Sequence, residues 1–156
     1  MTEQVTRRTV VGGLAGIAGL AAVSRARAAD GDPADLVRRL IEVAYGDADV
    51  DTIDDVAADE WVPSDPADPP GREALKARIV ANRQAFSVLW KTWTVTVDEA
   101  FATGPSAAAR ATLVGTGFDG THNSLGVVMI AHADGGKLVS AWSGTSELRA
   151  VGTPTP

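Results

Sequence analysis

The clearest pattern in the chain is an alternation of apolar and polar residues between Lys91 and Ala102. Strict alternation predicts a half-buried β-strand, because successive side chains of a strand point to opposite faces of its sheet. The apolar positions of this strand are Trp93, Val95, Val97 and Phe101. We expect these four side chains to share one face and to enter a core.

Three further strands are expected, over residues 107–117, 125–133 and 137–142. The first is rich in small and β-branched residues, and the second is a nearly continuous apolar run. Asp134-Gly135-Gly136 separates the second from the third, and a Gly-rich step between two apolar runs predicts a β-hairpin. The four strands together therefore predict an antiparallel meander.

Before the strands, apolar residues recur at the spacing of an α-helix. An Asp-Pro pair at residues 32–33 is a helix start, and this first helix is expected to end at Gly46. Residues 50–58 and 72–86 each carry one apolar stripe, which predicts two more helices, with a proline-rich loop over residues 61–71 between them. Helices followed by a meander predict an α+β fold, in which three N-terminal helices pack on a curved antiparallel sheet. Such a sheet, closed on one side by helices, forms a cone with a central pocket.

Residues 1–28 have the pattern of an export signal peptide. The arginine pair at residues 7–8 precedes an uncharged run, and residues 26–28 match a small-x-small cleavage site. The pair resembles a twin-arginine signal, which implies export to the periplasm or the extracellular space. An ordinary secretory signal and an uncleaved anchor are the alternatives. The folded domain is then expected over residues 29–150, with a disordered tail over 151–156.

Charge and cysteine content limit the function. The net charge is −6, and it becomes −9 without residues 1–28, which contain four arginines and one glutamate. An acidic domain argues against nucleic-acid binding, which needs a basic patch. There is no cysteine, which excludes a disulfide, a thiolate nucleophile and a Cys-based metal site. We expect no stable membrane span after cleavage of the signal.

Three motifs resemble those of one protein family. Residues 70–76 (Pro-Gly-Arg-Glu-Ala-Leu-Lys) resemble the Pro-Gly-x-x-x-Leu-Lys that begins the third helix of SnoaL-like proteins. Residues 120–122 (Gly-Thr-His) and 134–142 (Asp-Gly-Gly-Lys-Leu-Val-Ser-Ala-Trp) resemble that family's central turn and last hairpin. With the order of elements, residues 33–150 resemble the SnoaL-like polyketide (ester) cyclases of the nuclear transport factor 2-like superfamily.

The resemblance implies a cofactor-free and metal-free enzyme that cyclises or isomerises a small apolar molecule by acid–base chemistry. In the family, an Asp four residues after the hairpin Trp acts as acid and base, and Ser146 stands there in this chain. His132 lies where the family often has a histidine, and His122 belongs to the Gly-Thr-His motif. The catalytic candidates are therefore His132, Ser146 and His122, with His132 as the expected base, because imidazole titrates near neutral pH.

Each of these residues also has a structural interpretation. His132 shares a strand face with Val128 and Ile130 and fits a buried or edge histidine. His122 lies in a polar turn, where Asp, Gly and Asn serve the turn itself. No spacing of His and Asp supports a metal site. The candidate ligand-binding residues are the aromatic, acidic and thioether side chains Trp61, Trp93, Asp98, Asp119, Met129 and Trp142.

The presence of Ser146 in place of the family's Asp supports a second hypothesis. In it the chain is a non-catalytic small-ligand-binding or scaffold domain of the same fold. We expect a homodimer that forms through the sheet, as the resemblance implies. The two hypotheses differ in geometry, because an enzyme requires His132, Ser146 and a further polar group to converge on one cavity.

Overall fold

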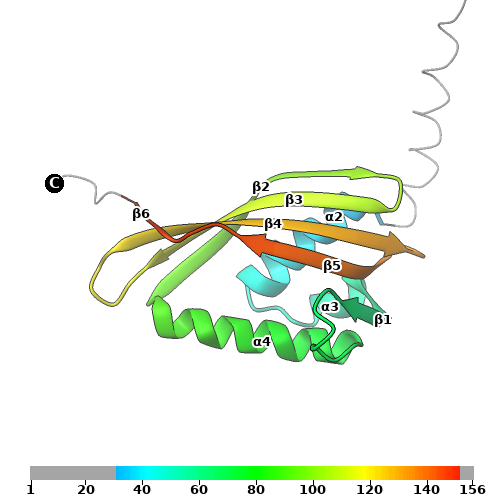
Figure 1. Ribbon diagram of the computed structural model, residues 1–156, viewed down its shortest axis with the longest axis horizontal. Coiled ribbons are helices and arrows are strands. Elements are labelled where there is room, and N and C mark those ends of the chain that lie inside the picture. The colour runs from blue at the N-terminus through cyan, green and yellow to red at the C-terminus, as the bar shows by residue number, and fades with distance from the viewer. Residues whose placement is uncertain (1–30, 152–156) are drawn as a thin grey trace, which may run out of the picture.

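The computed structural model describes residues 31–151, so the expected signal peptide (residues 1–28) and residues 152–156 of the expected tail lie outside the described residues. The fold is α+β, with a curved sheet whose one face carries the helices (Figure 1). The helices are α2 (Pro33–Arg39), η1 (Leu40–Gly46), α3 (Thr52–Val56) and α4 (Arg72–Leu89). The strands are β1 (Ala57–Pro63), β2 (Thr92–Thr103), β3 (Ser106–Thr116), β4 (His122–Asp134), β5 (Lys137–Thr145) and β6 (Arg149–Val151).

The sheet is mixed, in contrast to the antiparallel sheet expected from the sequence. Its strand order is β1-β5-β4-β3-β2, and β6 pairs with β4. The expected meander of β2 to β5 is present, but β1 runs parallel to β5. β1 begins within the expected second helix and ends in the proline-rich loop. An edge strand tolerates Pro63 at its end, because the missing N–H there breaks no central ladder.

The helices also differ from the expected three. The first is a continuous run whose second half, η1, is a π-helix, and α3 has only five residues. The third, α4, starts at Arg72 as expected and continues to Leu89. No helix of residues 31–151 is both long and apolar enough to span a membrane.

The hairpin between β4 and β5 agrees with its sequence pattern. Gly135 and Gly136 have φ values of 54° and 77°, in the left-handed region. Two consecutive residues of this kind form the tight turn that matches the twist of the flanking strands, and glycine adopts this conformation without steric cost. The turn therefore fixes the register in which Asp134 pairs with Lys137.

A β-bulge in β2 overturns one expectation about the core. The β2–β3 pairing shifts register between Val97 and Glu99. An inserted residue exchanges the two faces of the strand beyond it, so Val97 is 5% exposed whereas Phe101 is 60% exposed. Phe101 thus lies on the outer face, and Ala100 packs against the core instead.

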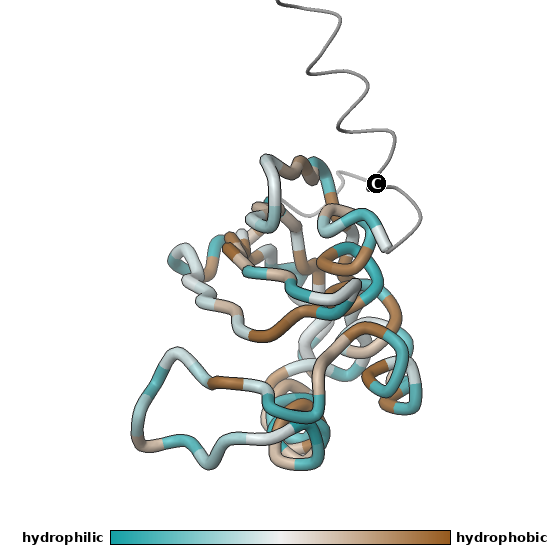
Figure 2. The backbone as a smooth tube through the Cα atoms, turned by 90° about the vertical axis from the view of Figure 1, so that its right-hand side faces the viewer, coloured by the Kyte–Doolittle hydropathy of each residue, from teal (hydrophilic) through white to brown (hydrophobic). Residues whose placement is uncertain are grey.

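The core lies between the inner face of the sheet and the helices (Figure 2). The inner positions of β3 and β4 are mainly alanines, with Met129 among them, so α2 can lie close to the sheet. Larger side chains from the helices, β1 and β5 fill the remaining space. The largest fully buried ones are Trp61, Leu40, Ile53, Ile79, Leu138, Val37 and Val56.

Candidate functional site

Two adjoining pockets lie between α4, β1 and the inner face of the sheet. The larger has a volume of about 210 Å³ and is lined by Trp61, Pro63, Asp68, Pro69, Ala74, Leu75, Ala77 and Arg78. The smaller has about 130 Å³ and is lined by Leu40, Tyr45, Trp61, Ser64, Leu75, Arg78, Asn82, Met129, Ala141 and Ser143. Trp61, Leu75 and Arg78 line both, so the two pockets meet at these side chains.

The π-helix η1 supplies Tyr45 to the smaller pocket. Nη1 of Arg83, on α4, donates hydrogen bonds to the backbone carbonyls of Tyr45 and Gly46, the latter at 2.7 Å. The guanidinium of Arg83 also lies 4.6 Å from the ring centroid of Trp93, in cation–π contact. Arg83 therefore satisfies carbonyls at the end of η1, which otherwise lack intrahelical donors, and holds the segment that carries Tyr45.

Tyr45 is a neutral hydrogen-bond donor in this setting. Burial raises the pKa of the Tyr45 phenol above its ordinary value of 10.0, and the neighbouring Arg78 and Asn82 side chains oppose that rise. Arg78 also forms an ion pair with Asp68 at the meeting point of the two pockets. The site thus combines an uncharged phenol, an amide and a pair of opposite charges that compensate each other.

Trp61 and Met129 are the two expected ligand-binding residues that line these pockets. Trp61 is 2% exposed, and its indole Nε1 has no hydrogen-bond partner among residues 31–151. A buried unpaired donor is costly, because it has lost its water without gaining an acceptor. Ser64, in the proline-rich loop, also lines the smaller pocket.

The three catalytic candidates do not converge on either pocket. His132 is exposed on the outer face of β4, where it pairs with Ser106 and Ser140 of the neighbouring strands. His122, at the other end of β4, has its Nδ1 at 3.1 Å from Thr116 Oγ1. At about 3.3 Å per residue of strand, the two histidines are about 30 Å apart.

Ser146 is exposed in the segment between β5 and β6. Its Oγ accepts a hydrogen bond of 2.9 Å from Gly126 N and donates one of 3.1 Å to the Glu147 carbonyl oxygen. Gly126 lies six residues before His132 on β4, which corresponds to about 20 Å. The structure therefore does not bring Ser146 and His132 together as a nucleophile and its base.

The remaining candidate ligand-binding residues lie outside both pockets. Asp98 is exposed and accepts a hydrogen bond of 2.8 Å from Thr112 Oγ1. The hydroxyl and backbone N–H of Thr121 bond to Asp119 and lower the pKa of its carboxyl group, as expected for a turn residue. Trp142 is 53% exposed on the outer face.

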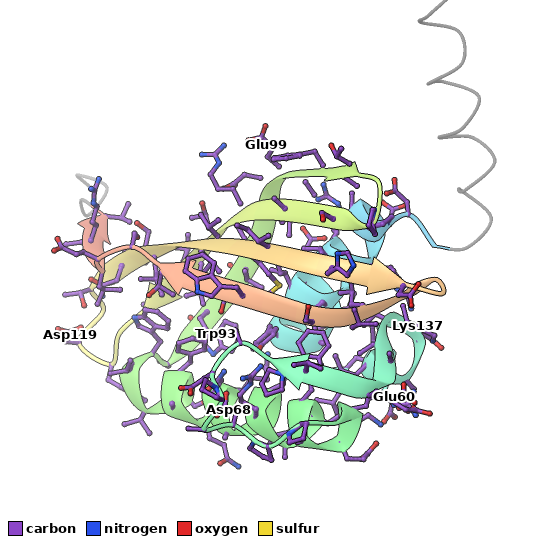
Figure 3. The ribbon with its side chains drawn as sticks, turned by 45° about the vertical axis from the view of Figure 1, so that its right-hand side comes forward. Glu60, Asp68, Trp93, Glu99, Asp119 and Lys137 are labelled. Atoms are coloured by element: carbon purple, nitrogen blue, oxygen red, sulfur yellow. The ribbon has the colours of Figure 1, made fainter. Side chains whose placement is uncertain are left out.

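The sheet separates some of these side chains widely (Figure 3). Asp119 lies at the opposite end of the sheet from Lys137, whereas Trp93 and Asp68 lie on the side of α4. Trp93 packs edge-on against Phe86, with ring centroids 5.3 Å apart. Within residues 31–151, no three His, Asp or Glu side chains are grouped so that they could hold a metal ion.

Sequence reasoning missed the polar side chains of the smaller pocket. One signal was present, because Asn82 falls on the apolar stripe of α4 together with Leu75 and Ile79. Asn82 is exposed in the structure, so the stripe leaves the core at this position and the amide lies at the open side of the smaller pocket. Tyr45 carried no comparable signal, since an aromatic residue near a helix end also fits plain core packing.

Comparison with known proteins adds the family. The sequence model of the SnoaL-like domain family matches residues 37–141 of this chain. No curated protein matches the chain. Among solved structures, TsrD from Streptomyces laurentii is 22% identical with a TM-score of 0.57, covering 80% of this chain and 88% of its own.

Two further structures share the fold. IdmH from Streptomyces antibioticus, which is described as a polyketide cyclase, is 22% identical over 72% of this chain and 91% of its own, with a TM-score of 0.56. An LEH-like epoxide hydrolase from M. tuberculosis is 15% identical over 73% of this chain and 82% of its own, with a TM-score of 0.54. At such identities the likeness is one of fold.

Proposed function

The chain belongs to the family of SnoaL-like domains, and from this premise we propose that it is a cofactor-free acid–base enzyme that cyclises or isomerises a small, largely apolar molecule. The site is the pair of pockets between α4, β1 and the sheet. The observation that carries the proposal is the partly buried Tyr45 phenol beside Arg78 and Asn82, at the wall of a pocket. An uncharged donor that is held in place at a pocket wall stabilises negative charge that develops on a substrate oxygen.

The reaction uses two groups of the site. The Tyr45 hydroxyl donates a hydrogen bond to a carbonyl oxygen of the substrate. The Asp68 carboxylate removes a proton from the adjacent carbon, and the electron pair of that C–H bond moves toward the oxygen to form an enolate. The Tyr45 hydroxyl stabilises the enolate oxygen. Return of the proton to a different carbon isomerises the substrate.

Ring closure follows from the same enolate. Its carbon attacks an electrophilic carbon of the same molecule, a new carbon–carbon bond forms, and the proton held by Asp68 neutralises the oxygen that becomes charged. In this proposal His132, Ser146 and His122 have no chemical role, because they lie outside both pockets. Electrostatic stabilisation of the enolate by the Tyr45 hydroxyl is the largest contribution expected here.

Enolisation can be tested without knowledge of the natural substrate. A protein that removes a proton next to a carbonyl exchanges it for deuterium in heavy water, and 4-phenyl-2-butanone is a suitable probe for proton NMR. We expect exchange above the buffer rate with the wild type, and its loss in Asp68→Asn and in Tyr45→Phe. Deuterium exchange that persists in both folded variants would refute the proposal.

A second function is favoured by the ion pair itself. Arg78 forms an ion pair with Asp68, the carboxylate that lines the larger pocket, so Asp68 must leave this partner before it can accept a substrate proton. The alternative is therefore a non-catalytic domain that binds a small ligand in the same pockets. It predicts that the ketone binds and that the wild type does not accelerate exchange, so the same NMR sample separates the two functions.

We also propose that the domain forms a homodimer through the outer face of its sheet. Large apolar side chains are exposed there, including Ile130, which is 51% exposed, together with Phe101, Val128 and Trp142. Contiguous apolar surface of this kind is typical of an interface. In analytical ultracentrifugation, Ile130→Glu should sediment as a monomer. Val88→Glu, at an exposed position of α4, should still sediment as a dimer. An unchanged oligomer in Ile130→Glu would rule out this face.

Export through a twin-arginine-type signal remains a proposal that rests on the arginine pair at residues 7–8. Replacing both arginines by lysine should retain the protein in the cytoplasm of a host that has this export route. Unchanged export would contradict that route and favour the ordinary secretory pathway.

A further inference from the structure

Building on the proposed function, we infer that the two pockets select uncharged molecules with a carbonyl oxygen at one end and an apolar body at the other. The oxygen end lies in the smaller pocket, against the sheet. The apolar body lies in the larger pocket, under the proline-rich loop. This assignment names a ligand class and an orientation, and it follows from polarity, charge and size.

Polarity divides the two pockets. The smaller one contains hydrogen-bonding groups from three directions: Tyr45 from η1, Asn82 from α4 and Ser143 from β5. In the larger one, the lining away from Asp68 and Arg78 is apolar, with Trp61, Pro63, Pro69, Ala74, Leu75 and Ala77. A ligand that fills both pockets must therefore have a polar end and an apolar end, because a polar group without a hydrogen-bonding partner is costly to bury.

Charge favours a neutral head group. Arg78 is already paired with Asp68, so the site offers no uncompensated positive charge to a carboxylate. A ligand carboxylate in the smaller pocket would add a second negative charge close to Asp68. A carbonyl oxygen needs only donors, and the Tyr45 hydroxyl, the Asn82 amide and the Ser143 hydroxyl can supply them. The head group is therefore a ketone, an aldehyde or an ester.

Size limits the two ends. A cavity of about 150 Å³ is large enough for benzene, so the larger pocket, at about 210 Å³, takes a ring of that size. The smaller pocket, at about 130 Å³, has room for an acetyl-sized group. Leu40 and Met129 close it on the side of the core. The preferred ligand is thus one apolar ring joined to a short carbonyl head.

Three probes with the same body and different heads test the ligand class. They are 4-phenyl-2-butanone (ketone), 3-phenylpropanoate (carboxylate) and ethylbenzene (no head), with dissociation constants from ligand-observed NMR. We expect the ketone to bind at least about tenfold more tightly than the carboxylate, because the carboxylate is desolvated without a free cation. Tyr45→Phe should weaken ketone binding by about fivefold to tenfold and leave ethylbenzene unchanged.

The orientation is tested with a fourth probe, 2-butanone, which has the head and lacks the ring. Ala74→Phe places a ring in the larger pocket, and should weaken 4-phenyl-2-butanone without weakening 2-butanone. Ala77→Phe is the second variant for the same pocket, and a cooperative thermal unfolding transition shows that either variant is folded. Equal weakening of both ketones in both variants would overturn the orientation.

Further outcomes separate this inference from the proposed function. Tighter binding of the carboxylate, or failure of the ketone to bind, would overturn the ligand class. Binding in the predicted order without deuterium exchange would refute the acid–base function and leave the ligand class supported. Deuterium exchange together with equal binding of all three probes would support the acid–base function and refute the ligand class.

Discussion

Glu42 Oε1 accepts a hydrogen bond of 2.8 Å from the backbone N–H of Val97, the residue at which β2 changes register. Arg38, one helical turn before Glu42, donates from Nη1 to the Val97 carbonyl oxygen at 3.2 Å. Two helical side chains thus bind both backbone groups of one strand residue. A bulge bends its strand, so these two side chains stabilise the bend of β2 at Val97.

Removing this acceptor should destabilise the fold. Glu42→Ala leaves the Val97 N–H without its acceptor, so we expect the free energy of unfolding to fall by about 1–3 kcal/mol. Urea unfolding measures the change. Glu42→Gln retains a side-chain oxygen and should recover most of the loss. Glu73→Ala, at an exposed site on α4, is the control, with an expected change within about 0.5 kcal/mol. Equal stabilities of Glu42→Ala and the wild type would contradict this role.

The state of the phenol can be measured directly, because Tyr45 is the only tyrosine in the chain. Burial raises its pKa, so the ultraviolet band of the phenolate should appear at higher pH than in free tyrosine. The unfolded chain then loses this proton first as pH rises. Stability due to the buried neutral phenol is therefore complete below pH 10.0 and is lost above it.

Tyr45→Phe supplies the control for that titration. The variant should show no phenolate band, and its unfolding free energy should decline less steeply above pH 10.0 than that of the wild type. A wild-type midpoint at or below the ordinary value would contradict a buried phenol.

Arg83 should raise the pKa of Tyr45, although it lines neither pocket. Its guanidinium bonds to the carbonyls of Tyr45 and Gly46 at the end of η1. In Arg83→Ala the end of η1 loosens, the phenol gains water, and the midpoint of the phenolate titration should move down toward that of free tyrosine. Arg110→Ala, on the outer face, should leave the midpoint unchanged. A folded Arg83→Ala variant with the wild-type midpoint would exclude this positioning role.

A glycine in β3 is required by a neighbouring ring. A Cβ atom at Gly115 would lie 2.5 Å from the nearest ring atom of Trp90, which is 3% exposed. We expect Gly115→Ala to lower the free energy of unfolding by about 1–3 kcal/mol, because the buried ring has no free space. Gly144→Ala is the matched control, since its Cβ would meet only the exposed Trp142 ring. Thermal unfolding measures both variants. An equal loss of stability in Gly115→Ala and Gly144→Ala would contradict the role of the buried Trp90 ring.

Much of the fold was predictable because its signals are local. The glycines at the β4–β5 turn predict that hairpin, and alternation within β4 correctly separates exposed Ile130 from buried Met129. The bulge in β2 has no comparable local signal. It depends on Arg38 and Glu42, more than 50 residues away in the chain. Phe101 was therefore placed on the wrong face.

The site was less predictable than the fold. Trp61 and Met129, two of the expected ligand-binding residues, line the smaller pocket, because large apolar side chains near a concave face tend to line it. The polar group of Tyr45 and Asn82 forms only when η1 packs beside α4, so no motif in the sequence contains both residues. Sequence reasoning instead favoured the histidines of β4, which are chemically conspicuous and lie outside the pockets.

We propose that function resides in the inner pockets and not on the outer face of the sheet. The most direct measurement compares α-proton exchange of 4-phenyl-2-butanone in Tyr45→Phe and His132→Ala under identical conditions. We predict loss of exchange in Tyr45→Phe, because the oxyanion donor is removed, and the wild-type rate in His132→Ala. Loss of exchange in His132→Ala with the wild-type rate in Tyr45→Phe would contradict the claim and move the site to the outer face.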